Sequence, residues 1–244
     1  MRPTLRLAHC SDIHLDSDYY GGPRNLAERD RYRAIFDRLL ADLARAQPDL
    51  VLLAGDLFDS NRASTDTIEW AMARLSALPM PLALIPGNHD CLAPDAIFLR
   101  HDFGRLSGVH TLLDPDGETR ELPDLGVRLW GRGMIDHAPH NDPLHGAPAA
   151  HPELWNLGLA HGIHVPEGAE CRNSSPIPAA DIAASGFDYL ALGHHHGVRD
   201  ASAGPVTAWY SGAPAGLFRQ PGTWLLVELE AQRGPRVQVR ELPD

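Results

Sequence analysis

The residues best suited to chemistry are Asp, His and Asn, which recur in five short polar clusters along the chain. The clusters occupy residues 11–14 (SDIH), 55–59 (GDLFD), 87–90 (GNHD), 160–162 (AHG) and 193–196 (GHHH). Side chains of an extended segment repeat every two residues, so Asp12 and His14 point to one side, as do His194 and His196. Carboxylate, imidazole and amide-oxygen ligands without cysteine suit Mn²⁺, Fe²⁺ or Zn²⁺. The clusters therefore predict a metal site.

The number of candidate ligands exceeds what a single ion requires. Two ions about 3.5–4 Å apart that share one carboxylate take about seven protein ligands. The sequence therefore predicts a centre of two adjacent divalent metal ions.

Each cluster closely follows an apolar run typical of a buried strand. In the first half of the chain the predicted strands are residues 5–9, 50–54 and 82–85. Between them, apolar periodicity predicts helices over residues 28–46 and 65–78, the second capped by Ser64 or Thr65. This βαβ order implies parallel strands, and ligand sites form beyond the carboxyl ends of such strands. The clusters are therefore expected to converge.

The second half of the chain is richer in strands, which predicts a second sheet. The candidate strands are residues 109–113, 127–130, 157–160, 189–192, 206–210, 224–229 and 237–240. Residues 131–152, rich in His, Pro, Ala and Gly, are expected to form a long surface loop. The sequence contains no internal repeat and no linker, so a single domain over residues 1–244 is expected.

Composition excludes several classes of protein. With 244 residues, 43% hydrophobic and 22% charged, the chain is typical of a globular protein. All 21 basic residues are arginine, which excludes a lysine-dependent P-loop and a Schiff-base enzyme. The net charge of -11 disfavours non-specific nucleic-acid binding but leaves a local arginine patch open. Without an apolar span or signal-peptide pattern, we expect a cytoplasmic protein with no membrane association.

Taken singly, each cluster is weak evidence, since short Asp and His turns are common. Taken together and in order, the five clusters resemble the calcineurin-like metallophosphoesterases, whose motifs are D-x-H, GD-x-x-D, GNH-D/E, an isolated H and GH-x-H. The resemblance covers nearly the whole chain and implies an α/β fold, a four-layer αββα sandwich with two facing mixed sheets. The segments HCSDIHLDS, LLAGDLFDS, LIPGNHD and DYLALGHHH are most similar to the SbcD-type DNA repair exonucleases.

The resemblance implies two divalent ions, Mn foremost with Fe or Zn as alternatives, and it assigns their ligands. The first ion would be held by Asp12, His14, Asp56 and His196. The second would be held by Asp56, Asn88, His161 and His194, with Asp56 bridging the two. His195 occupies the variable position between ligands. His164 competes with His161 for the isolated position, and His161 is preferred because it directly follows a strand.

The same resemblance assigns two residues to catalysis rather than to metal binding. His89 is expected to protonate the leaving-group oxygen or stabilise the transition state, and Asp59 to hold His89 in orientation. Asp90 is expected to be a turn residue, and Asp16 is a candidate to hydrogen-bond to a metal ligand and orient it. All these roles are predictions.

The implied substrate is a phosphoester, with three functions open. The first is a phosphodiesterase with exonuclease-like DNA repair activity, and the second is an enzyme for cyclic nucleotides or nucleotide-lipids. The third is a weakly active, metal-bound scaffold subunit, against which His89 and Asp59 argue. The acidic charge and the 48 residues after His196 favour short substrates over duplex DNA. Candidate phosphate-binding residues are Arg24, Arg62, Arg132 and Arg219. The oligomeric state stays open.

Overall fold

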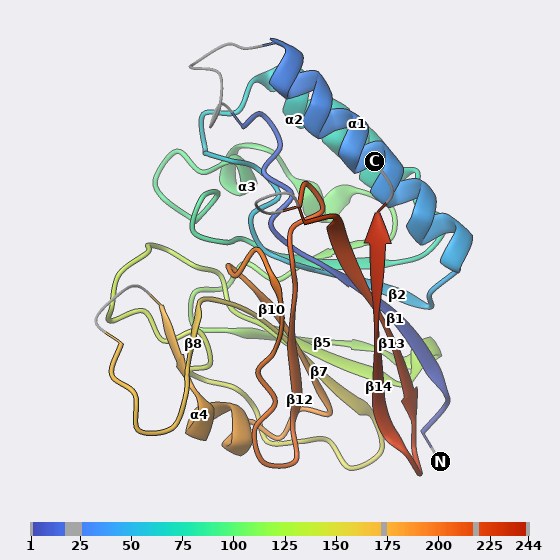
Figure 1. Ribbon diagram of the computed structural model, residues 1–244, viewed down its shortest axis with the longest axis vertical. Coiled ribbons are helices and arrows are strands. Elements are labelled where there is room, and N and C mark those ends of the chain that lie inside the picture. Colours follow the sequence, from blue (N-terminus) through green and yellow to red (C-terminus); the bar gives the residue numbers. More distant parts are fainter. Residues whose placement is uncertain (1, 18–25, 172–174, 217–219, 243–244) are drawn as a thin grey trace.

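The computed structural model describes residues 2–17, 26–171, 175–216 and 220–242, which form two six-stranded sheets packed face to face (Figure 1). The first sheet has the order β14-β13-β1-β2-β3-β4. Its strands are β1 (Leu5–Cys10), β2 (Leu50–Ala54), β3 (Leu82–Ile85), β4 (Val109–Thr111), β13 (Gly222–Glu230) and β14 (Gly234–Leu242). Strands β1 to β4 run parallel, as the βαβ pattern predicts, while β13 and β14 add antiparallel pairs.

The second sheet has the order β11-β12-β10-β7-β6-β5. Its strands are β5 (Glu118–Leu122), β6 (Val127–Gly131), β7 (Trp155–His161), β10 (Tyr189–Gly193), β11 (Val198–Asp200) and β12 (Thr207–Ser211). The four central strands are parallel, and β5 and β11 close the edges antiparallel. A separate parallel pair is formed by β8 (Ile163–Val165) and β9 (Pro176–Pro178).

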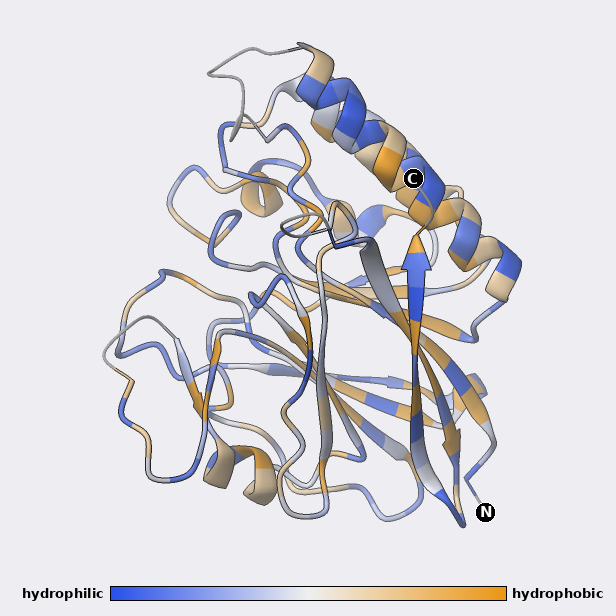
Figure 2. Cartoon of the chain, viewed as in Figure 1, coloured by the Kyte–Doolittle hydropathy of each residue, from blue (hydrophilic) through white to orange (hydrophobic). Residues whose placement is uncertain are grey.

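Helices cover the outer face of each sheet. On the first sheet, α1 (Leu26–Ala46) and α2 (Thr65–Ser76) lie side by side, with α3 (Ile97–Arg100) and the 3₁₀ turn Phe103–Arg105 beside them (Figure 1). On the second sheet lies the short α4 (Ala179–Ala184), and a 3₁₀ turn, Pro123–Leu125, precedes β6. Hydrophilic and hydrophobic residues alternate along α1 (Figure 2), as expected of a helix that covers a core with one face.

Three apolar clusters fill the spaces between these layers, because inward residues alternate along the strands. In β2, Val51 and Leu53 face the helices α1 and α2, whereas Leu50, Leu52 and Ala54 face the second sheet. The third cluster joins the far side of the second sheet to Ile182 of α4. This arrangement confirms the predicted α/β fold class, with helices outside two facing mixed sheets.

Several elements differ from the sequence prediction. Ser64, not Thr65, caps α2, accepting a hydrogen bond from the backbone N–H of Thr67. The helix ends at Ser76, two residues earlier than predicted. The strands β5, β8, β9 and β11 were not predicted, because β5 is a polar edge strand and the other three have only three residues each. Within the described ranges, no helix is long and apolar enough to cross a membrane.

Candidate metal centre

The first two polar clusters are joined directly by their backbones at the carboxyl ends of β1 and β2. The N–H of Asp12 donates to the carbonyl of Gly55 at 3.1 Å, and the N–H groups of Ile13 and His14 donate to the carbonyl of Asp56 at 2.8 and 3.1 Å. These bonds continue the parallel pairing of β1 and β2 beyond the strands. They place the side chains of Asp12, His14 and Asp56 at one edge of the sheet.

Backbone strain concentrates at the same edge. Asp12, His14, Asp56 and His194 have φ values of 56°, 54°, 54° and 100°, a region that side-chain-bearing residues rarely adopt. Such conformations cost about 1–3 kcal/mol each and gather at functional sites. Gly55, with φ at 89°, is required here because a Cβ at this position would collide with the ring of His161.

The first group of candidate ligands combines residues from both sheets. The Nε2 atoms of His14 and His196 lie 3.1 Å apart. His14 Nε2 is 3.7 Å from Asp56 Oδ2, and His196 Nε2 is 3.7 Å from Asp12 Oδ1. One donor atom from each of Asp12, His14 and His196 falls within 4.8 Å of the others. These residues are the ones predicted to hold the first ion.

The second group shares Asp56 with the first. His161 Nε2 lies 3.3 Å from Asp56 Oδ2 and 3.0 Å from Asn88 Oδ1. His194 Nδ1 approaches the same Asn88 oxygen at 2.8 Å. The structure therefore brings all seven predicted ligands into two adjoining groups with Asp56 between them.

The donor set of both groups fits divalent cations. Asp12 and Asp56 are 0% and 1% exposed, yet no arginine among the described residues forms an ion pair with either carboxylate. Buried carboxylates need compensating positive charge, which a metal ion would supply. His14 Nδ1 donates to Asp59, and His161 Nδ1 donates to the carbonyl of Ala54 at 2.8 Å, which leaves both Nε2 atoms for a metal.

The pKa shifts of Asp56, His161 and His194 reflect how closely the charged groups of the site lie together. Burial alone would lower the pKa of His161, but the adjacent carboxylate of Asp56 raises it to about 9. Burial would likewise raise the pKa of Asp56, but the charge of His161 lowers it instead. Burial, with the charge of His161, lowers the pKa of His194 to about 4. Without metal, the Asp56–His161 pair carries a proton, and binding of a metal ion must displace it.

His89 and Asp59 lie beside the first group but are connected differently from the prediction. The Asp59 carboxylate is 2.9 Å from His14 Nδ1 and 3.7 Å from His89 Nδ1. His89 Nδ1 donates instead to the main-chain carbonyl of Asp59 at 2.7 Å. The carboxylate thus orients a candidate ligand, and the peptide carbonyl orients His89. With a side chain 41% exposed, His89 is open to a substrate.

Other predicted residues prove to be structural. Asp90 is fully buried and accepts hydrogen bonds from the N–H groups of Gly87 and Phe58, which holds two loops together. The carboxylate of Asp16 accepts from the Ser64 N–H and the Thr67 hydroxyl, so it braces the start of α2 rather than a ligand.

The alternative histidines lie outside the two groups. His164 belongs to β8 and contacts Tyr210, whose hydroxyl accepts from its backbone N–H at 2.7 Å, so the structure favours His161. The ring of His195 is exposed and lies 2.8 Å from the carbonyl of Gly197.

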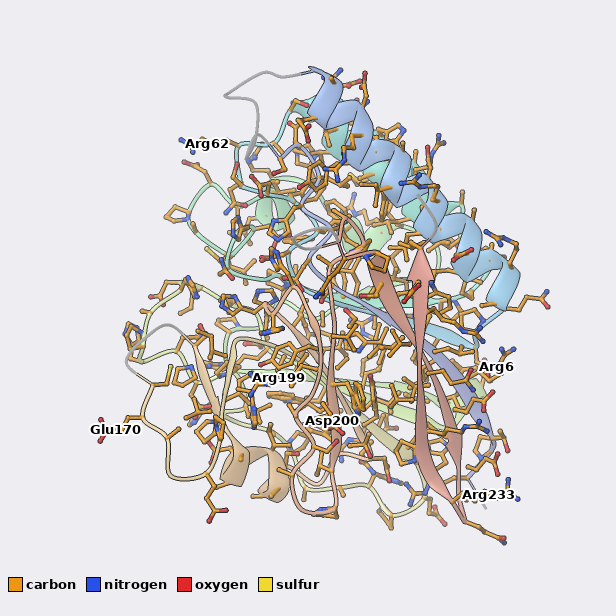
Figure 3. The ribbon with its side chains drawn as sticks, in the orientation of Figure 1. Arg6, Arg62, Glu170, Arg199, Asp200 and Arg233 are labelled. Atoms are coloured by element: carbon orange, nitrogen blue, oxygen red, sulfur yellow. The ribbon has the colours of Figure 1, made fainter. Side chains whose placement is uncertain are left out.

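Of the four arginine candidates, the structure describes Arg62 and Arg132, and neither is among the residues that it brings together at the site. Arg24 and Arg219 lie outside the described residues. The guanidinium of Arg132 donates to the main-chain carbonyls of Pro115 and Asp142, so it builds the loop after β6. Arg62 projects into solvent at the periphery (Figure 3).

Sequence reasoning missed two residues at the site. The Ser11 hydroxyl donates to Asp12 Oδ2 and lies 2.9 Å from the Ser211 hydroxyl of the second sheet. His137, from the loop after β6, lies against the ring of His194. The position of Ser11 next to a ligand could have suggested its role. His137 belongs to the His-rich loop of residues 131–152, which the sequence makes the best candidate to shape the pocket, but no motif singled out this residue.

Comparison with known proteins places the chain in a family. The profile of the family "Calcineurin-like phosphoesterase" matches residues 5–198. The DNA double-strand break repair protein Mre11 of Methanopyrus kandleri is 26% identical over 261 residues, covering 94% of this chain and 51% of that protein. The chain therefore spans about half the length of this relative.

Solved structures agree on the fold. One covers 99% of this chain and 100% of its own with a TM-score of 0.63 at 10% identity. A novel archaeal phosphodiesterase covers 97% of this chain and 100% of its own with a TM-score of 0.50 at 12% identity. At these identities the likeness shows the fold alone. Because the family profile spans most of the sequence, this chain belongs to the calcineurin-like phosphoesterase family, as its five motifs predicted.

Proposed function

We propose that the chain is a two-metal phosphodiesterase whose first ion is held by Asp12, His14, Asp56 and His196, and whose second is held by Asp56, Asn88, His161 and His194. The observation that carries the proposal is the sharing of one buried carboxylate, Asp56, between two groups of donors drawn from both sheets. The oxygen and nitrogen donors suit Mn, Fe or Zn, and we propose Mn foremost.

The chain's own residues suit phosphoryl transfer. When bound, two divalent ions supply a water of lowered pKa and neutralise charge on the phosphoryl oxygens. Because His89 Nδ1 donates to the Asp59 carbonyl, it is Nε2 of the doubly protonated imidazolium that would deliver a proton to the leaving oxygen, which leaves His89 neutral. The Asp59 carboxylate accepts a hydrogen bond from His14 Nδ1 and so orients this ligand, and the backbone N–H of His89 donates to Asp56 Oδ1 at 2.9 Å. The loop of residues 87–90 thus supports the bridging ligand Asp56 and also carries the acid His89.

The substrate we infer is a phosphodiester that is short or flexible. The Mre11 relative is described as a DNA repair protein, which supports an exonuclease-like activity, but it is about twice as long as this chain. The net charge of -11 favours a small diester over a long duplex. A metal-bound scaffold without turnover is disfavoured, because a protein that only binds metal ions does not need an exposed histidine held in a fixed orientation, as His89 is. The cytoplasmic location stays a prediction.

A substrate panel tests this proposal. The purified chain is loaded with Mn²⁺ and assayed on p-nitrophenyl phosphate, bis(p-nitrophenyl) phosphate, a cyclic nucleotide, single-stranded DNA and duplex DNA. We expect the diester to be cleaved faster than the monoester, and Asp56→Ala to abolish the activity and so exclude a contaminating phosphatase. Two bound ions per chain with no turnover on any ester would instead identify a scaffold. Faster cleavage of the monoester would contradict the diesterase assignment.

A further inference from the structure

The loop between β6 and β7 brings an additional imidazole to the second group of ligands. The rings of His137 and His194 meet edge to face, with centroids 5.2 Å apart. On the side of the first group, His89 meets His14 in the same geometry at 4.6 Å. Two exposed imidazoles from different loops therefore flank the metal centre, and the mechanism above uses only His89.

The loop is held in place on both sides of His137. The Leu92 N–H donates to the carbonyl of Met134 at 2.7 Å, which ties the loop to the segment that follows Asn88. The carbonyl of Ala138 accepts from the N–H groups of Asn141 and Ser175 at 3.0 and 3.1 Å. Asn141 also donates from its side chain to the Ser175 hydroxyl at 2.9 Å. The position of His137 is thus defined by bonds to two distant parts of the chain.

His137 differs from the other imidazoles of the site in having hydrogen-bonding capacity to spare. Across the described residues, neither of its ring nitrogens has a protein hydrogen-bond partner, and the residue is exposed. In either protonation state an imidazole carries at least one N–H group, which can donate to an anionic oxygen.

We propose that His137 is a substrate-contacting residue that donates a hydrogen bond to a phosphoryl oxygen on the side of the second group, where it complements His89. This inference rests on the proposed function, because it assigns the anionic ligand of that same site. The ligand class is a phosphate ester, with inorganic phosphate as its simplest probe. Hydrogen bonds to charged acceptors are the stronger ones, so a single contact has a measurable effect.

The competing explanation is that His137 only packs against His194 and keeps that ligand in position. The two explanations predict different results for different side chains. A packing role requires an aromatic ring, so His137→Phe would preserve it and His137→Ala would weaken metal binding. A hydrogen-bonding role requires an N–H donor, so Phe would fail like Ala, whereas His137→Gln would recover part of the function through its amide.

The experiment measures binding as well as turnover. Isothermal titration calorimetry gives the Mn²⁺ stoichiometry and affinity of each variant, then the affinity of the Mn²⁺-loaded protein for inorganic phosphate, and steady-state assays give KM for bis(p-nitrophenyl) phosphate. We expect His137→Ala and His137→Phe to weaken phosphate binding and raise KM by about 5- to 20-fold, with Mn²⁺ affinity nearly unchanged. His140→Ala is the matched control, since His140 lies on the same loop and pairs with Asp136 at the surface.

Each outcome decides the question. Unchanged phosphate affinity in His137→Ala, or an Mn²⁺ affinity that falls in His137→Ala and is restored in His137→Phe, would overturn the inference. Failure of the proposed function has a different signature, because the wild-type protein would then bind Mn²⁺ and hydrolyse no ester. The effect of His137 on phosphate affinity would remain measurable in that case.

Discussion

At the scale of single residues, Asp59 contacts a proposed metal ligand and the proposed general acid through two different atoms. Its carboxylate accepts a hydrogen bond from Nδ1 of His14, and its main-chain carbonyl accepts one from Nδ1 of His89. Substitution of the side chain therefore removes only the first of these bonds. The spacing GD-x-x-D predicts that Asp59 lies near the site, but which oxygen meets which imidazole depends on backbone geometry that spacing does not reveal.

Substitution of His89 should separate catalysis from metal binding. We expect His89→Ala to lower kcat by roughly 10²–10⁴, the usual contribution of a general acid, while both ions stay bound. Metal analysis beside steady-state kinetics provides the measurement, with Asp56→Ala as the variant that loses metal. Because one atom each of His14, Asp56 and His89 also lies within 4.8 Å of the others, loss of an ion in His89→Ala would identify His89 as a ligand instead.

Substitution of Asp59 should act mainly on the first ion. Removing the partner that orients a ligating histidine costs about 10- to 100-fold in metal affinity, so Asp59→Ala should weaken Mn²⁺ binding to this extent. At saturating Mn²⁺ its kcat should fall less than that of His89→Ala, because the carbonyl that orients His89 remains. Asp59→Asn keeps an oxygen acceptor and should lie closer to wild type. Equal kcat losses in Asp59→Ala and His89→Ala would show that the carboxylate itself orients the acid.

At the scale of secondary-structure elements, β1 and β10 meet across the two sheets through a buried polar pair. His9 of β1 is fully buried, with Nδ1 2.9 Å from the hydroxyl of Tyr189 and Nε2 without a partner in the described structure. Burial lowers the pKa of His9 to about 3 from 6.5. The unfolded chain therefore binds this proton at a higher pH than the folded chain does.

This linkage predicts that the free energy of unfolding falls at acid pH and that part of this loss is due to His9 alone. The contribution of His9 to stability is complete above about pH 6.5 and is lost as the pH falls toward 3, by at most about 1.4 kcal/mol per pH unit. Urea unfolding at pH 7 and pH 5 in EDTA should show this loss in the wild type and a smaller pH difference in His9→Gln. His140→Gln, at an exposed site, should keep the wild-type difference. An unchanged pH difference in His9→Gln would exclude the linkage.

The elements that position the ligands were predictable from sequence, because an apolar run that ends in a polar cluster is a local signal. The placement of Asp12 beyond β1 and of Asp56 beyond β2 follows from such runs. The placement of His137 does not, because it depends on bonds from Met134 and Ala138 to residues far away in the sequence. The exposed strand β5 was missed for a related reason, since an edge strand has no buried face to produce alternation.

At the scale of the whole molecule, the metal centre should brace the two sheets against each other. Asp12, Asp56 and Asn88 follow strands of the first sheet, whereas His161, His194 and His196 lie at the ends of strands of the second. Bound ions would therefore connect the layers at a point where the backbone is strained. Ligands that bind only the folded state stabilise it in proportion to their free concentration and affinity.

Metal addition should consequently raise the melting temperature. At a free Mn²⁺ concentration about 100 times Kd, one site contributes about 2.7 kcal/mol, and each kcal/mol shifts Tm by about 2–4 °C in a chain of this size. Thermal unfolding with EDTA and with Mn²⁺ should differ by at least about 5 °C in the wild type and by little in Asp56→Ala. Equal shifts in both proteins would place the stabilising ion elsewhere.

The charge of the whole molecule bears on the choice between a small diester and duplex DNA. Two divalent ions change the formal charge from -11 to -7, since 4 is added, and the gain is confined to the site. An extended duplex requires many neutralised phosphates, and 6–10 such contacts would cost about 10³–10⁵ in affinity between 50 and 200 mM salt. Among the described candidates, Arg132 is occupied within its loop and Arg62 projects away from the body of the protein (Figure 3).

We therefore expect hydrolysis of bis(p-nitrophenyl) phosphate to change little over this salt range, because only the ions and one or two side chains meet the phosphate. Cleavage of duplex DNA should be slower than cleavage of single-stranded oligonucleotides, and its salt dependence should correspond to one or two contacts rather than many. The measurement compares kcat/KM for the three substrates at 50, 100 and 200 mM salt with Mn²⁺ held constant. Efficient duplex cleavage with a steep salt dependence would instead identify an extended DNA-binding surface on this acidic chain and restore the nuclease assignment in full.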